Sequence, residues 1–600
     1  MATANVVQTS ISGGHSNALA IQGDGAFLPK LDTTSRLGLT LGTPDKGLMV
    51  YDTTLTTICV WNGVAWEFVG DSSNGWISVK DFGAKGDGVT NDSAAVQSAI
   101  NYVNSIGGGT VFFPSATYLL DSQINLCDNL VMYGYGAKIK VGTSFAAINA
   151  PLFKNFAGTL FNIPGAILAT KNISFYGFEF DGQSVGIPGA SIPNANMRGV
   201  MICIGGWTAA SGITNLTVKD CFMHDFAGTG ILTFATSNIL ISNNRFLNFL
   251  SNVSLSQGSG VSLYDANQTV VSGNTFDHTS TGYSWHGMTF LDWITSSNNL
   301  TVSANVVTNM NNGDGISCEG NTLNNLYNGV FTANVIKNCN GQGIGVDNCV
   351  SVTISDNMIE GVGGPGILFT QTEDAVITGN SITTSGLGGI VTRTSQRAVI
   401  SNNKIKDITY YDNNFRGEGI SILTTFVGTE SFDITGNLII NTAGAGIFAG
   451  SYNCLISSNN IYNAGTNAII AVTLRAGIIA GDQGNVVSNF INSSGNTPYA
   501  ISSAASNFPS IEANRIYGTF TTAYYRISYR ANLNVNLNSS IEDARYDVLT
   551  NTFIGRFNGA PAGYWYRGDT MYATLPSSAG YIGQVNVADG ANWKTFGLIS

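Results

Sequence analysis

Short apolar runs, rich in β-branched residues and bounded by Gly or Asn, recur along the chain from about residue 199 to 516. A Gly followed by an apolar residue forms one series: Gly199, Gly230, Gly260, Gly287, Gly315, Gly343, Gly366, Gly389, Gly419 and Gly446, continued by Ala468 and Ala500. An Asn two residues before Ile, Val or Phe forms a second, interleaved series: Asn244, Asn274, Asn305, Asn334, Asn357, Asn380, Asn403, Asn437, Asn459, Asn489 and Asn514. A period mostly in the twenties, built from short strands and Gly or Asn corners, is typical of a solenoid.

No helical period fits between the two series, so each repeat predicts one coil of a single-stranded parallel β-helix. A buried Asn at a corner tolerates left-handed backbone geometry, and its amide can bond to the Asn of the next coil. Side chains alternate between the two faces of a strand, so the apolar residue after each Gly is expected to point inward.

One segment departs from the strand pattern and predicts an amphipathic helix over 93–103. Its apolar face consists of Val96, Ala99, Ile100 and Val103, spaced i, i+3, i+4, i+7. Asn91 or Asp92 can cap its start, and Gly107 to Gly109 can end it. Such a helix would cover the open end of the solenoid core.

The pattern predicts three regions. Residues 1–75 form a β-rich unit, in which 46–70 read as a β-meander turning at Asn62-Gly63. Residues 76–525 form the β-helix with its capping helix, and 526–600 form a transition and a C-terminal β-rich region.

Composition narrows the possible functions. Charged residues make up 10% of the chain against roughly 25% in an average domain, and there are 72 glycines, as stacked strands with tight corners require. A net charge of −11 argues against a nucleic-acid partner, because phosphate binding needs clustered Lys and Arg. The eight cysteines contain no CxxC pair, so we expect buried free thiols.

No run is long and apolar enough to cross a bilayer, since the best candidate, 468–481, contains Arg475. We therefore expect no membrane insertion. The first residues lack a basic start and an apolar core, so we also expect no secretory signal peptide.

Two motifs carry a resemblance to a known family. VKDFGAKGDG (79–88) and GGGTVFFPSATYLL (107–120) resemble the opening of the pectate-lyase-like superfamily, and more closely its bacteriophage tailspike and polysaccharide depolymerase branch. The resemblance implies a right-handed parallel β-helix and a homotrimer that binds and usually cleaves bacterial capsule, O-antigen or exopolysaccharide. GLMVYDT (47–53) and VWNGVAWE (60–67) resemble N-terminal segments of phage tail fibres, which implies attachment to a tail or baseplate and a location on the virion. Residues 564–600 resemble a C-terminal segment of β-helical glycan proteins.

Candidate catalytic residues follow from the Gly series. The fourth residue after each Gly should face outward, and this column contains Phe234, Tyr264, Leu291, Glu319, Asp347, Thr370 and Arg393. Glu319 and Asp347 should therefore lie on adjacent coils, about 4.8 Å apart. Tyr264 and Arg393 would flank them.

Asp265 and Asp292 fall one position later, where a straight strand would point them inward. Two unpaired charges in an apolar core are costly, so we expect the strand to turn there and present both to solvent. Trp285, His286 and Trp293 belong to the same coil as Asp292 and supply flat rings for a sugar.

Glycoside hydrolysis needs one carboxylic acid and one carboxylate, and adjacent coils suit the close, retaining spacing whereas a gap of one coil suits the inverting one. Asp265, Asp292, Glu319 and Asp347 are the candidates. Outward carboxylates more often only solubilise a sheet, so a catalytically inert receptor-binding adhesin remains an alternative. A lyase, the third possibility, would use His286 or Tyr264 as base and Arg393 to stabilise the enolate.

Asp314 in GDG and His286 in WHG are similar to short polygalacturonase motifs, but their order is reversed and no Arg-Ile-Lys follows. Pectin hydrolysis is therefore not expected, and the two residues are kept as candidates for substrate binding. No metal-ligand cluster stands out, so we expect no cofactor. Outward apolar residues such as Leu368, Val391, Leu423 and Phe448 would need covering, which favours a trimer.

Overall fold

The structure is a computed structural model. It describes residues 6–7, 19–22, 25–54, 57–64, 66–69, 75–143, 153–154, 171–183, 202–205, 213–250, 258–279, 284–292, 296–321, 323, 325–409, 417–423, 431–450, 453–471, 474–481, 484–503, 510–521, 523–527, 535–538, 542–547, 552–557, 570–573, 581–586 and 593–598. The chain divides into two compact units, residues 1–245 and 246–600. Among the described residues, no helix is long and apolar enough to cross a membrane.

The first unit begins with small β-sheets. The strands are β1 (Val6–Val7), β2 (Leu19–Gln22) and β3 (Gly25–Phe27) in one sheet and β4 (Lys30–Leu31), β5 (Met49–Asp52), β6 (Thr57–Trp61) and β7 (Trp66–Val69) in another. β5, β6 and β7 form the expected antiparallel meander, and Gly63 at its turn has a φ of 101°. Helix α1 (Thr33–Leu37) contributes Arg36, which pairs with Asp52 at 2.7 Å inside this small core.

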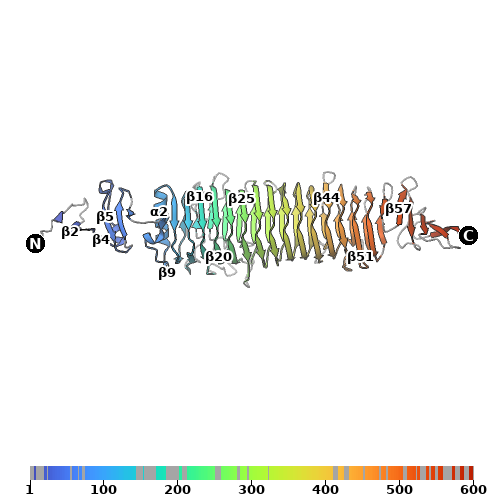
Figure 1. Cartoon of the computed structure of the whole chain (residues 1–600), viewed down its shortest axis with the longest axis horizontal. Helices are drawn as coiled ribbons and strands as arrows, with labels where there is room; N and C mark the ends of the chain where they lie inside the picture. Colours follow the sequence, from blue (N-terminus) through green and yellow to red (C-terminus); the bar gives the residue numbers. More distant parts are fainter. Residues whose placement is uncertain are drawn as a thin grey trace. The chain divides into compact units, whose positions relative to one another are not determined.

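Helix α2 (Ser93–Ser105) covers the segment expected to be helical, and Figure 1 shows it beside the first coils. Its buried face includes Val96, Ala99, Ile100 and Val103. The Asn91 side chain caps the start by accepting the Ser93 N–H at 3.0 Å. The Asp92 carboxylate instead accepts the Lys85 and Gly86 N–H groups, and 3-10 helix η2 (Val79–Phe82) packs nearby.

Three parallel sheets make up the coils of the first unit (Figure 1). Sheet 1, the strands after the Gly series, contains β12 (Ile124–Asn125), β15 (Phe153–Lys154), β18 (Ile202–Gly205) and β21 (Ile231–Phe234). Sheet 2 contains β8 (Ile77–Ser78), β10 (Gly109–Phe112), β13 (Leu130–Tyr133), β16 (Lys171–Tyr176), β19 (Ile213–Lys219) and β22 (Thr236–Ser242). Sheet 3 contains β9 (Asp87–Asn91), β11 (Thr117–Leu120), β14 (Lys138–Val141), β17 (Glu179–Asp181) and β20 (Phe222–Ala227).

The second unit repeats the same three sheets over more coils. Sheet 1 contains β24 (Val261–Tyr264), β27 (Met288–Leu291), β30 (Ile316–Glu319), β33 (Ile344–Asp347), β37 (Pro365–Thr370), β40 (Gly388–Arg393), β43 (Ile420–Leu423), β46 (Ile447–Ala449), β49 (Ala476–Ala480), β52 (Tyr499–Ser503) and β55 (Ala523–Ile527). Sheet 2 contains β25 (Asn267–Ser272), β28 (Asn298–Ser303), β31 (Leu326–Thr332), β34 (Cys349–Val350), β35 (Thr353–Ser355), β38 (Ala375–Thr378), β41 (Arg397–Ser401), β44 (Ser431–Thr435), β47 (Cys454–Ser457), β50 (Asn485–Val487), β53 (Ser510–Glu512) and β56 (Val535–Asn538). Sheet 3 contains β23 (Arg245–Leu250), β26 (Thr275–Asp277), β29 (Val306–Thr308), β32 (Val335–Lys337), β36 (Met358–Val362), β39 (Ser381–Ser385), β42 (Lys404–Ile408), β45 (Leu438–Thr442), β48 (Asn460–Tyr462), β51 (Phe490–Ser494) and β54 (Arg515–Thr519).

Five further strands follow near the C-terminus: β57 (Glu542–Asp547), β58 (Thr552–Phe557), β59 (Thr570–Ala573), β60 (Tyr581–Asn586) and β61 (Trp593–Leu598). They pair antiparallel, except that β58 and β59 are parallel. The predicted all-β solenoid of stacked coils is therefore confirmed, with a change of topology at its end.

The Asn series forms a buried hydrogen-bonded ladder in the second unit. From Asn274 to Asn514, each side-chain Nδ2 donates to Oδ1 of the next Asn at 2.9–3.0 Å. The expectation of left-handed backbone at these Asn residues is wrong. The residue just before each Asn has that conformation instead, for example Ala304 (φ 54°), Asp356 (φ 56°) and Asn402 (φ 56°).

The strand register corrects two members of the Gly series. Ile447 of β46 pairs with Ile478, so Gly477 and not Ala468 occupies the next position. Ile202 pairs with Ile231, which moves the first position to residue 201, and Gly199 itself lies outside the described residues. The expectation of buried free thiols is confirmed for Cys59, Cys127, Cys221, Cys318, Cys339, Cys349 and Cys454, whereas the side chain of Cys203 is not described.

Candidate functional site

A column of outward side chains runs along sheet 1 of the second unit, and we call it the carboxylate column. Strand pairing aligns its members in one register: Tyr264, Leu291, Glu319, Asp347, Thr370, Arg393 and Leu423. The residue that precedes each member along its strand, such as Cys318 before Glu319 and Val346 before Asp347, points inward and is buried. The fold thus brings Glu319 and Asp347 onto neighbouring strands, as the sequence predicts.

Glu319 and Asp347 differ in their surroundings. Glu319 is exposed, and Ser317 Oγ donates a hydrogen bond to its Oε1 at 2.9 Å. Asp347 is half-buried, and its Oδ1 has no hydrogen-bond partner among the described residues. Burial raises the pKa of Asp347, the Glu319 charge raises it further, and a hydrogen bond from the Asn348 backbone opposes this rise. One acid is therefore shifted toward its protonated form beside a solvated one.

A second oxygen without a partner lies next to this pair. A Cβ on Gly345 of β33 would lie 2.3 Å from Gln342 Oε1, so the Gln342 side chain rests on the glycine. Gln342 Oε1 is buried and has no hydrogen-bond partner in the described part of the chain. Buried acceptors nearly always have a hydrogen-bond partner, so we expect ordered water to donate to Asp347 Oδ1 and Gln342 Oε1.

Sequence reasoning missed Ser317 and Gln342. The signal for Gln342 was present, because Gly345 stands where the neighbouring strands carry Ser317 or Leu368. A Gly inside a strand indicates that another group approaches closely.

Asp265 and Asp292 are not presented to solvent, which corrects the prediction. The chain does turn at Asp265, which has a φ of 50°, but the two residues are only 2% and 6% exposed. The Asp292 carboxylate accepts hydrogen bonds from the Ser297 N–H at 3.0 Å and from the Ser297 hydroxyl. These partners lower the cost of burying the carboxylate. Burial, with the Asp265 charge adding to it, raises the pKa of Asp292 to about 6.

Buried His286 and half-buried Asp314 lie together in the loops before β27 and β30. The Asp314 backbone N–H donates to His286 Nδ1 at 2.9 Å, and Asp314 Oδ1 accepts the Gln342 N–H at 2.6 Å. Burial lowers the pKa of His286 to about 3. Burial raises the pKa of Asp314 to about 6. The hydrogen bond from the Gln342 N–H opposes this rise, and the Glu319 charge adds to it. His286 is thus a neutral ring with one nitrogen already engaged.

The remaining candidates lie around the column. Tyr264 is half-buried, and burial together with the Glu319 charge raises its pKa to about 12. Arg393 is half-buried on the second strand beyond Asp347. The Trp285 ring lies 4.9 Å from His286 in an edge-on contact, and Trp293 lies outside the described residues.

One group of described residues has the geometry to hold a metal ion, Asp181, His224 and Asp225 in the first unit. His224 Nδ1 lies 2.8 Å from Asp225 and Nε2 lies 3.2 Å from Glu179. Lys138 contacts both Glu179 and Asp181 within 2.9 Å. These ion pairs account for the cluster without a metal.

Two family models match the chain. The rhamnogalacturonase A/epimerase, pectate lyase-like family matches residues 76–155, and the right-handed beta helix region matches 170–331 and 314–479. The predicted resemblance to pectate-lyase-like β-helices is confirmed, and so is the right-handed fold.

Individual relatives match smaller parts. Plasmin and fibronectin-binding protein A of Streptococcus pneumoniae (strain ATCC BAA-255 / R6) is 29% identical over 185 residues, 28% of this chain and 24% of that protein. Alginate lyase 7 of Azotobacter vinelandii is 42% identical over 66 residues, 10% of this chain. The chain thus spans 24% and 8% of the lengths of these curated relatives.

Among solved structures, a tailspike protein mutant of E. coli bacteriophage HK620 in complex with a pentasaccharide is similar, with a TM-score of 0.52. The two are 17% identical, and the match covers 79% of this chain and 83% of the tailspike chain. This likeness supports the fold. Since the right-handed beta helix model matches residues 170–331 and 314–479, more than half of the sequence, the chain belongs to the family of right-handed β-helix proteins.

Proposed function

We propose that this protein is a tailspike-like glycoside hydrolase that binds and depolymerises a bacterial surface polysaccharide. The observation that carries the proposal is the pairing of Glu319 and Asp347 on adjacent strands of one outward column. One carboxyl is exposed, and the other has a raised pKa. Glycoside hydrolysis requires one protonated carboxyl group as acid and one ionised carboxylate, and the raised pKa of Asp347 suits it to the role of the acid.

In the proposed first step, a Glu319 oxygen bonds to the anomeric carbon while the glycosidic C–O bond breaks. Asp347 donates its proton to the leaving oxygen. Water then attacks the anomeric carbon, gives a proton to the Asp347 carboxylate and releases Glu319. Adjacent strands are about 4.8 Å apart, which favours the retaining spacing of about 5–5.5 Å between carboxyl groups.

The other candidates support the site in different ways. Buried Ser317 orients Glu319 through its hydrogen bond, the half-buried Gln342 side chain lies on the same face and can contact a sugar, and Tyr264 provides a flat ring at one end of the pair. Asp265, Asp292 and His286 are buried and Asp314 is half-buried, so these four lie behind the column and support it rather than facing a ligand. His286 is therefore a weak candidate for the base of a lyase.

Assembly and location are part of the same proposal. We infer a homotrimer on a phage virion, attached to the tail or baseplate through its N-terminus and acting at the host surface. The fold of a phage tailspike determined with a pentasaccharide supports this context. The expectation that exposed apolar side chains of sheet 1 need covering by a trimer is partly wrong. Val391 is only 1% exposed within its own chain, and Leu368, Leu423 and Phe448 are half-buried.

The test is incubation of the protein with purified capsule, O-antigen and exopolysaccharide from candidate hosts, followed by measurement of reducing ends and of ultraviolet absorbance. We expect new reducing ends without the absorbance of an unsaturated uronate. Absorbance would identify a lyase instead. Binding with no product from any polysaccharide would identify an adhesin.

Substitution of either acid should abolish cleavage but not binding. Glu319→Gln and Asp347→Asn keep size and hydrogen-bonding capacity, so the variants should fold, bind glycan and lose about three or more orders of magnitude in rate. Asp356→Asn, at an exposed corner just after β35, is the matched control and should cleave normally. Parental turnover in both site variants would refute the assignment.

A further inference from the structure

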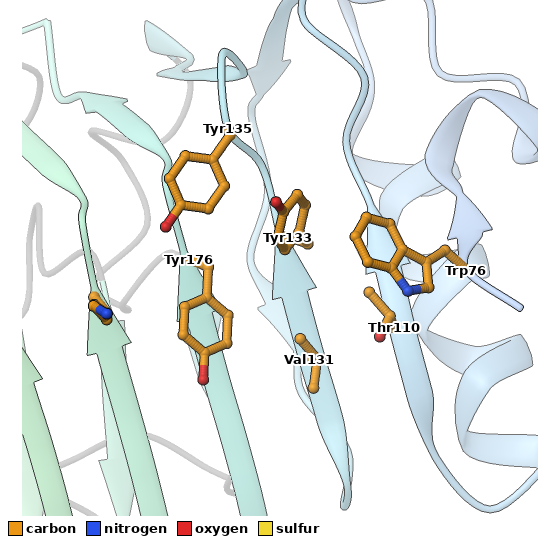
Figure 2. A pocket seen from close by; sticks show the side chains of 7 residues that line it. Trp76, Thr110, Val131, Tyr133, Tyr135 and Tyr176 are labelled. Atoms are coloured by element: carbon orange, nitrogen blue, oxygen red, sulfur yellow. The ribbon is translucent and has the colours of Figure 1, made fainter. Parts of the chain in front are cut away.

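A separate hollow of about 370 Å³ lies on the outer face of sheet 2 in the first unit. Four aromatic side chains line it, Trp76, Tyr133, Tyr135 and Tyr176, together with Thr110 and Lys219 at its edges. Figure 2 shows Trp76, Tyr133 and Tyr176 along a row that crosses neighbouring strands, with Tyr135 beside them. Its volume falls in the range of small-ligand sites, about 300–1,000 Å³.

Three of the rings contact one another in tilted pairs. The Trp76 and Tyr133 ring centres are 4.5 Å apart with the planes at 48°, and those of Tyr133 and Tyr135 are 5.1 Å apart with the planes at 53°. Tyr135 is 46% exposed, and Trp76, Tyr133 and Tyr176 are half-buried. Trp76, Tyr133 and Tyr135 therefore have aromatic neighbours, while part of each ring stays open.

The fold itself does not require aromatic residues here. Phe112, Tyr133 and Tyr176 occupy one aligned outward column, which continues as Lys219 and Ser242. In the corresponding column of the second unit, eight successive coils carry a hydroxyl residue at this strand position, before Val487 and Glu512: Ser272, Ser303, Thr332, Ser355, Thr378, Ser401, Thr435 and Ser457. Because eight coils are built with Ser or Thr there, the aromatic residues of the first coils indicate a role other than building the sheet.

The polar groups around the rings are those that a sugar needs. The Tyr135 hydroxyl donates to Asp220 Oδ2, which raises the pKa of Tyr135 to about 12 and keeps it neutral. Lys219 and Thr110 supply donors at the rim. One cation and one carboxylate balance the local charge, which favours a neutral ligand over a strongly anionic one.

We propose that this hollow is a second, non-cleaving glycan-binding site, which stacks a neutral saccharide segment on Trp76, Tyr133 and Tyr176. Flat rings match the C–H face of a pyranose, and the rim donors match its hydroxyls. No carboxyl group is among the lining residues, so the site binds without hydrolysis. The inference does not depend on cleavage at the carboxylate column.

The test is a glycan array of neutral O-antigen and capsule oligosaccharides together with maltohexaose, cellohexaose and chitohexaose. The full chain carrying Glu319→Gln is the parent, so that bound glycan is not cleaved. Tyr133→Ala in this parent should weaken binding of at least one neutral glycan by about tenfold, the loss of one stacking contact, and Trp76→Phe, which keeps a smaller ring, should weaken it less. Ser303→Ala, in the hydroxyl column of the second unit, is the matched control and should not change binding.

Trp76 also reports binding directly. Saturating the parent with the bound glycan should change tryptophan fluorescence, and the change should be smaller in Trp76→Phe. Tyr176→Ala, checked by circular dichroism, replaces Tyr133→Ala if the latter does not fold. Absence of neutral glycan binding by the parent, equal binding by the folded variants, or a loss of oligomer without a loss of glycan binding would each overturn the proposal.

Discussion

Asp347 combines a buried oxygen that lacks a partner in the described chain with a charged neighbour on the next strand. Both conditions disfavour its ionised form, so its pKa is raised. A general acid works only while it is protonated. The hydrolytic rate should therefore persist above the usual aspartate pKa of about 3.9 and fall as pH rises through the raised pKa of Asp347.

Initial rates of reducing-end release between about pH 4 and pH 9, at constant ionic strength, measure this dependence. Ser317→Ala is a useful companion, because it removes the hydroxyl that donates to Glu319 without touching Asp347. A rate that increases steadily with pH would contradict the role of Asp347 as the acid.

Asp314 should make the stability of the protein decrease as pH rises. Burial raises its pKa from 3.8 to about 6 in the folded chain. The folded state therefore binds the proton more tightly, and this contribution is complete below the unfolded pKa and is lost as pH rises through the folded pKa. Asp314→Asn cannot ionise, and its oxygen can still accept the Gln342 N–H.

The Tm of Asp314→Asn minus that of the parent should therefore increase between about pH 4 and pH 7, by the equivalent of at most about 3 kcal/mol. His286 is present in both proteins and cancels in the difference. Scanning fluorimetry across this pH range, with the exposed Asp356→Asn as control, measures the effect. A constant difference would show that Asp314 does not titrate in this window.

At the scale of the coil, the glycines that precede the strands of sheet 1 leave little room for a side chain. A Cβ on Gly343 would lie 2.5 Å from the Gly366 carbonyl oxygen and 2.6 Å from Ile359 Cγ2. Overpacking of this kind costs about 1–3 kcal/mol. Gly343→Ala should therefore lower the Tm clearly in calorimetry.

Gly484→Ala is the matched control, since its new methyl group would have no neighbour closer than 3.5 Å. Its Tm should remain within about 0.5 kcal/mol equivalent of the parent. Equal melting of the two variants would mean that the strand alignment is wrong at Gly343.

The fold was predictable because Asn and Gly recur at fixed places in the repeat, where the structure restricts which side chain fits. The Asn series needs a buried amide partner in the next coil, and the Gly series needs a position without a Cβ. The alignment failed only where a loop changes length, as before Gly477. The side-chain environment was harder to predict. Asp292 looked too costly to bury, but Ser297, five residues later and outside the repeat pattern, supplies its hydrogen bonds.

At the scale of the whole molecule, one outward column of sheet 2 in the second unit exposes apolar side chains. Val376 pairs with Val399, and the column also carries Val270 and Leu455, with Thr301, Val330, Thr353 and Asp433 between them. We call the exposed Val and Leu side chains of this column the stripe. These four are 38–39% exposed. A repeated apolar stripe on a flat sheet is a suitable surface for neighbouring copies in a trimer.

Val399→Lys should therefore weaken the trimer, because it places a charge in the stripe. Light scattering should give three chain masses for the parent at micromolar concentration and a smaller mass for the variant. Ile469→Lys, at a position that is 81% exposed and outside the stripe, should leave the mass unchanged. A single-chain mass for the parent would contradict the trimer.

The Asn ladder makes the length of the protein adjustable in whole steps. Asn357 and Asn380 make the same contacts 23 residues apart, so the chain between them is a module whose removal would join two equivalent corners. Each such module adds one coil, and so lengthens the solenoid of the second unit by about 4.8 Å. It also sets the spacing of charges on the surface. Without that one module, Arg393 would lie on the strand next to Asp347. The number of coils therefore determines both the length of the solenoid and which charged side chains are neighbours.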